Sequence, residues 1–144
     1  MSTLTTIPDL HAATWRVAEA DRVLLDALEQ WRVRIEAELT GLSMAFDLHV
    51  SAVAAPGGLF DDVVAQEPRL HRRVHVLRTE QQALRSELDQ ALADLADPRM
   101  VTNPHRIKGL HALVHEVVER LSRHESRAMS LSFEAYNVDL GDPV

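Results

Sequence analysis

Apolar residues recur every three or four positions along most of the chain, and such stripes predict amphipathic helices. The clearest stripe lies in residues 110–136, where steps of three and four residues select one polar position among apolar ones. Its members are Leu110, Val114, Val117, Leu121, His124, Ala128 and Leu131. His124 therefore interrupts a helix face that is otherwise suited to a dry core.

Three further stripes predict three more helices. Residues 9–54 are too long for one helix in so small a domain, so we expect two helices with a reversal near Arg32 to Glu36, although no Gly or Pro marks it. A third helix is expected from about residue 69 to residue 95. The three stripes are Val17, Asp21, Leu24 and Leu28; Leu39, Leu42, Phe46, His49 and Val53; and Leu70, Val74, Leu77, Gln81, Leu84, Leu88, Ala91 and Leu95.

Two segments rich in Gly, Pro and Asp separate the later helices. They read "AAPGGLFDD" (residues 54–62) and "DPRMVTNPH" (residues 97–105), where Asn103 and Pro104 suit a helix cap and first turn. Strand-like alternation is missing from the sequence, and aromatic residues make up only 4%. The prediction is an all-α, antiparallel up-down four-helix bundle, with residues 1–144 as one domain and 137–144 as a short C-terminal tail.

Charge and composition exclude several classes of function. The formal net charge of −7 argues against binding to nucleic acid or to an anionic membrane surface. Because the chain has no cysteine, disulfides, iron–sulfur clusters and cysteine nucleophiles are excluded. Neither a signal peptide nor an apolar run of membrane-spanning length is evident, so we expect a cytoplasmic protein.

Each of the four stripes carries one polar residue at a core position: Asp21, His49, Gln81 and His124. Counting the 1.5 Å rise per residue from the expected turns places the four at similar heights. We therefore expect them to meet in the middle of the bundle as one polar layer.

The segments "FDLHVSAVAAPGGLF", "LRTEQQALRSEL" and "RLSRHESRAMSLSFEAYNVDLG" resemble the second, third and fourth helices of the hemerythrin-like (HHE cation-binding) family. The resemblance implies a bundle that holds two irons through histidines and carboxylates. In that comparison His49 and His124 match family ligands, Asp21 lies at or beside the first-helix ligand, and Gln81 replaces a histidine. The residues four positions after the two histidines are apolar, so the bridging carboxylates are missing and the di-iron site is largely lost.

Two interpretations of the polar layer remain open. In one, the four side chains form a buried hydrogen-bonded cluster, no cofactor is bound, and the protein has a non-enzymatic binding, sensing or scaffold role. In the other, His49, His124 and Asp21, with Gln81 as a weak fourth ligand, hold one Fe, Zn or Mn ion for oxygen- or redox-linked chemistry. No nucleophilic triad or phosphate-binding loop supports another enzyme class.

Apolar residues outside the stripes predict a protein partner, which we expect to be a second copy of this chain. They are Trp15, Trp31, Val33, Met44, Leu113 and Val118. The histidine pairs His111–His115 and His71–His75 lack a third ligand and are interpreted as surface features.

Overall fold

The computed structural model describes the backbone of residues 2–140 and the side chains of residues 10–136. Four α-helices, α1 (Ser2–Val53), α2 (Leu59–Gln66), α3 (His71–Leu95) and α4 (Pro104–Leu140), are joined by two 3₁₀ turns, η1 (Pro68–Leu70) and η2 (Pro98–Thr102). No strand occurs within residues 2–140, so the all-α prediction is confirmed. None of the described helices combines the length and apolar character that crossing a membrane requires.

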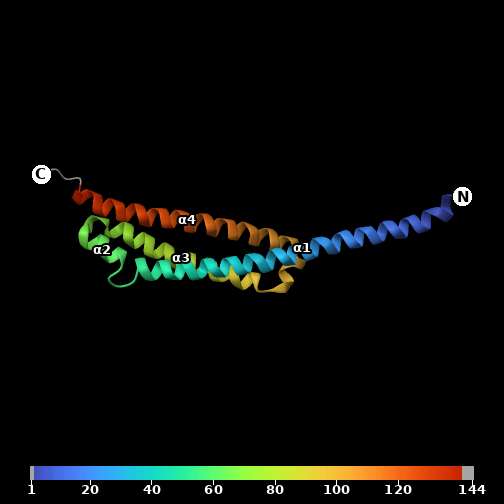
Figure 1. Ribbon diagram of the computed structural model, residues 1–144, viewed down its shortest axis with the longest axis horizontal. Coiled ribbons are helices and arrows are strands. Elements are labelled where there is room, and N and C mark those ends of the chain that lie inside the picture. The colour runs from blue at the N-terminus through green and yellow to red at the C-terminus, as the bar shows by residue number, and fades with distance from the viewer. Residues whose placement is uncertain (1, 141–144) are drawn as a thin grey trace.

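The C-terminal half of α1, α3 and α4 pack along one another, and the N-terminal half of α1 extends past the end of the other helices (Figure 1). α3 contacts both α1 and α4, and α2 packs against α4 at the far end. α1 and α4 run in the same direction, and α3 runs in the opposite direction (Figure 1). The two parallel helices therefore flank α3.

The expected reversal near Arg32 to Glu36 is wrong, because α1 continues through it without interruption. The Arg32 guanidinium donates to Glu29 at 2.5 Å and to Glu36 at 3.1 Å, which joins three successive turns of the helix. The same guanidinium donates to the carbonyl of Leu95 at 2.6 Å and so fixes α1 against the end of α3. Residues expected to form a turn instead stabilise a straight helix.

The two predicted breaks are confirmed. Gly57 has φ 77°, a backbone conformation that favours glycine, in the turn between α1 and α2. Before α4, the side chain of Asn103 accepts from the backbone N–H groups of His105 at 3.0 Å and Arg106 at 3.4 Å, which makes it the helix cap. α4 runs to Leu140, past residue 137 where the tail is expected to begin, and residues 141–144 lie outside the described part.

The core consists of two clusters along the bundle. One is built around Phe46, Leu84 and Val117, and the other around Val53, Leu77 and Ala128. His49, Gln81 and His124 each lie in sequence between a residue of one cluster and a residue of the other. The polar positions of the stripes therefore mark the boundary between two apolar layers.

Candidate functional site

The structure brings together three of the four residues predicted to form the polar layer, His49, Gln81 and His124. Asp21 is not among them: it is exposed on α1, and 28 residues of continuous helix, about 42 Å, separate it from His49. The expected meeting of all four within one chain depended on the reversal that α1 does not make.

His124, which is 1% exposed, has a hydrogen-bond partner at each ring nitrogen. Its Nε2 lies 3.2 Å from the amide nitrogen of Gln81, and its Nδ1 lies 2.8 Å from Oε1 of Glu80. An amide nitrogen can only donate, so Nε2 accepts and the proton on Nδ1 is donated to Glu80. Arg127 also donates to both oxygens of Glu80, at 2.6 and 2.5 Å, which fixes the carboxylate.

His49 lies beside this network without joining it. Its ring meets that of His124 edge-on, with the centroids 5.5 Å apart, and stacks on Phe46 with an interplanar angle of 16°. Nε2 of His49 is buried and has no hydrogen-bond partner. Burial, followed by repulsion from His124, lowers the pKa of His49, and Glu125 opposes that shift. His49 therefore presents a neutral, unpaired imidazole.

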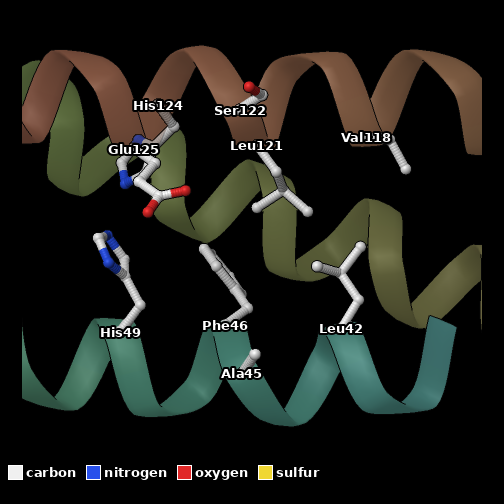
Figure 2. A pocket seen from close by; sticks show the side chains of 9 residues that line it. All are labelled: Leu42, Ala45, Phe46, His49, Val118, Leu121, Ser122, His124 and Glu125. Carbon is white, nitrogen blue, oxygen red and sulfur yellow. The ribbon is translucent and has the colours of Figure 1, made fainter. Parts of the chain in front are cut away.

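The unpaired imidazole lines a groove of about 340 Å³ between α1 and α4. Figure 2 shows Leu42, Phe46 and His49 pointing from α1 toward α4, Leu121 and His124 pointing back, and α3 passing behind. The lining residues are Leu42, Ala45, Phe46, His49, Val118, Leu121, Ser122, His124 and Glu125. Such a mainly apolar surface with a few polar groups is typical of a small-molecule site.

Sequence reasoning missed Glu80 and Arg127, which complete the His124 network. Neither occupies a stripe position, but each was detectable from its neighbours. Glu80 directly precedes Gln81, and Arg127 follows His124 by three residues on the same side of α4. A search for carboxylates and cations beside the polar stripe positions would have found both.

The remaining histidine pairs lie at the surface, as predicted. His111 and His115 are exposed; the first lies 6.4 Å from Trp31 between ring centroids, and the second pairs with Glu119 at 3.4 Å. His71 and His75 are also exposed. These histidines do not extend the polar layer.

The side-chain arrangement bears on the metal interpretation in two ways. Among the residues that the structure describes, no three His, Asp or Glu side chains are grouped so that they could share a metal ion. Both nitrogens of His124 are already hydrogen-bonded, whereas Nε2 of His49 has no hydrogen-bond partner and could act as a metal ligand. Comparison with protein-family models, with curated proteins and with solved structures found no match to this chain.

Proposed function

We propose that this chain is a hemerythrin-like helical binding protein of the cytoplasm, with a largely lost di-iron site and a non-enzymatic role. Its binding site is the groove between α1 and α4. The observation that carries the proposal is the buried, unpaired Nε2 of His49 in a mainly apolar lining. A buried polar atom without a partner costs free energy, and a ligand that supplies the missing hydrogen bond recovers it.

The groove selects its ligand by shape and by one polar contact. Leu42, Phe46 and Leu121 offer apolar surface, which favours a ring or a short hydrocarbon. The pKa of His49 is lowered, so its imidazole is neutral at neutral pH and carries one donor and one acceptor nitrogen. The proposed ligand class is a small, largely apolar molecule with one hydroxyl, carbonyl or amine group.

A non-enzymatic role is supported by how the other polar groups are engaged. His124 is held between Gln81 and Glu80, and Glu80 is held by Arg127. A general acid or base must exchange its proton with the substrate. His124 instead uses both nitrogens to join α4 to α3, which is a structural role.

The test uses 1-naphthol as a probe, because it combines an apolar ring with one hydroxyl, and naphthalene as its matched partner without the hydroxyl. We expect 1-naphthol to perturb the His49 side-chain signals in ¹H–¹⁵N NMR spectra and naphthalene to bind more weakly. His49→Phe keeps an aromatic ring but removes both nitrogens, so it should abolish the preference for naphthol. His115→Phe, at an exposed position, is the control. Equal binding of the two probes to the unsubstituted protein would contradict the proposal.

The second candidate is a mononuclear metal protein, favoured by the two imidazole rings with centroids 5.5 Å apart and by the free Nε2 of His49. His124 would serve as a ligand only after releasing Gln81 or Glu80. Asp21 of the same chain lies too far along α1 to join the two histidines. A metal bound only by the folded state raises the melting temperature. We expect Fe(II), Zn(II) and Mn(II) to leave it unchanged; a rise that His49→Leu and His124→Leu both abolish would select the metal interpretation.

A further inference from the structure

The N-terminal half of α1, residues 10–28 (here the α1 arm), exposes a face that is core elsewhere on the same helix. Leu10, Val17 and Leu24 follow one another at seven-residue spacing and are 65%, 70% and 55% exposed. Leu39 and Phe46 have the same spacing farther along the helix and are buried. Figure 1 shows the arm extending past the helices that cover this face in the C-terminal half.

The chain exposes more surface than a compact monomer of its size. Its accessible surface is 10029 Å², whereas a compact monomer of this mass exposes about 7,400 Å². The excess is about 2,600 Å² per chain, or about 5,200 Å² for two copies, which is at the upper end of the total area that obligate dimers bury. The bare apolar face of the arm contributes to this excess, and an obligate dimer interface would cover this face.

A cavity of about 800 Å³ lies where the arm meets the bundle, between α1 and the start of α4. Its lining is Asp21, Leu24, Leu25, Leu28, Trp31, Val101, Thr102, Pro104, Ile107, Lys108 and His111. Because α1 and α4 are parallel, a helix that packs between them in the opposite direction completes an antiparallel four-helix arrangement with α3. The cavity therefore lies where the fourth helix of such an arrangement would pack.

We propose that two copies of this chain form a dimer by pairing their α1 arms antiparallel, each arm packing against α1 and the start of α4 of the other copy. The pairing is reciprocal, so one two-fold axis covers both arms and both cavities. An unrelated helix would fill the cavity but leave the arm bare. η2 and the start of α4 already lie beside Asp21 to Trp31. The bundles of the two copies cannot pack on the same part of the paired α1 helices. The two-fold axis must therefore lie between the two bundles, near Asp21 to Leu28.

The first test compares two adjacent, similarly exposed positions on the arm. Leu24, 55% exposed, lies on the apolar face, and Val23, 59% exposed, lies about 100° away around the helix. In sedimentation velocity runs at high micromolar concentration, the unsubstituted chain should be dimeric. Leu24→Glu should weaken the dimer about thirtyfold or more, and Val23→Glu should leave it intact. Circular dichroism melting of both variants checks that the fold is retained.

The second test measures the direction of pairing. The chain has no cysteine, so a spin label can be attached to one introduced cysteine, at Ala12 or at Arg22. In the antiparallel dimer the distance between the two copies of the label should be about 30 Å longer at position 12 than at position 22. Equal distances at the two positions, a monomer at high micromolar concentration, or equal weakening by Val23→Glu and Leu24→Glu would each overturn the proposal.

Discussion

Replacing His124 and Gln81 by leucine, singly and together, tests whether the polar layer is one coupled unit. Both side chains are buried, with His124 1% exposed and Gln81 4% exposed, and the amide nitrogen of Gln81 lies 3.2 Å from Nε2 of His124. His124 also donates to Glu80, but that carboxylate keeps Arg127 when the imidazole is removed. The group left without a partner in the His124→Leu protein is therefore the Gln81 amide.

The contacts set the size of the effect. A buried amide without its partner costs about 1–3 kcal/mol, and the added apolar side chain recovers about 1 kcal/mol of this. We expect His124→Leu to lower the free energy of unfolding by up to about 2 kcal/mol, and Gln81→Leu to lower it by about as much because it leaves Nε2 of His124 unpaired. The double variant removes both members of the pair, so its loss should be smaller than the sum of the two single losses.

Urea unfolding followed by circular dichroism measures all four proteins, with Gln82→Leu as the control. Gln82 is next to Gln81 but exposed, so its replacement should change the free energy of unfolding by less than about 0.5 kcal/mol. Losses from His124→Leu and Gln81→Leu that add within about 0.5 kcal/mol would refute the coupling. They would show that the two side chains stabilise the fold independently.

Three further predictions concern other parts of the chain. Folding lowers the pKa of His49 from 6.5, so as the pH falls the imidazole is protonated in the unfolded chain before it is in the folded one. The free energy of unfolding should therefore be retained above pH 6.5 and fall below it, and the urea midpoint of His49→Phe should depend less on pH. Arg32→Ala should lower the melting temperature more than Arg34→Ala, because Arg32 is buried and holds a carbonyl of α3, whereas Arg34 is exposed. By calorimetry Gly57→Ala, at φ 77°, should destabilise by about 1 kcal/mol, while Gly41→Ala, in open helix, should stabilise by about 0.5–1 kcal/mol.

The third and fourth helices could be predicted from the sequence because their stripes are bounded by residues that stop helices. Gly57 and Asn103 take the turn and cap positions that their chemistry favours. Between such boundaries, a polar residue in phase with an apolar stripe must be buried, as Gln81 and His124 are.

The partners within the polar layer could not be predicted in the same way. Periodicity places each residue on a helix face, but it does not say how far a long side chain reaches. Glu80 and Arg127 lie beside the stripes and reach the layer through their flexible chains. His49 was expected to join a mutually hydrogen-bonded cluster, and its Nε2 is instead buried without a partner.

The error at α1 has a different origin, because the two stripes assigned to separate helices are in phase. Leu28 and Leu39 are eleven residues apart, about three helical turns, so one straight helix presents both stripes on the same face. Residues that would stop the helix between them are missing, and Arg32 instead joins Glu29 to Glu36. An apolar stripe indicates that a face will be covered, but not by which chain. A hairpin would cover the face containing Asp21 within one chain, whereas the straight helix leaves it exposed, and the proposed dimer would cover it with a second copy.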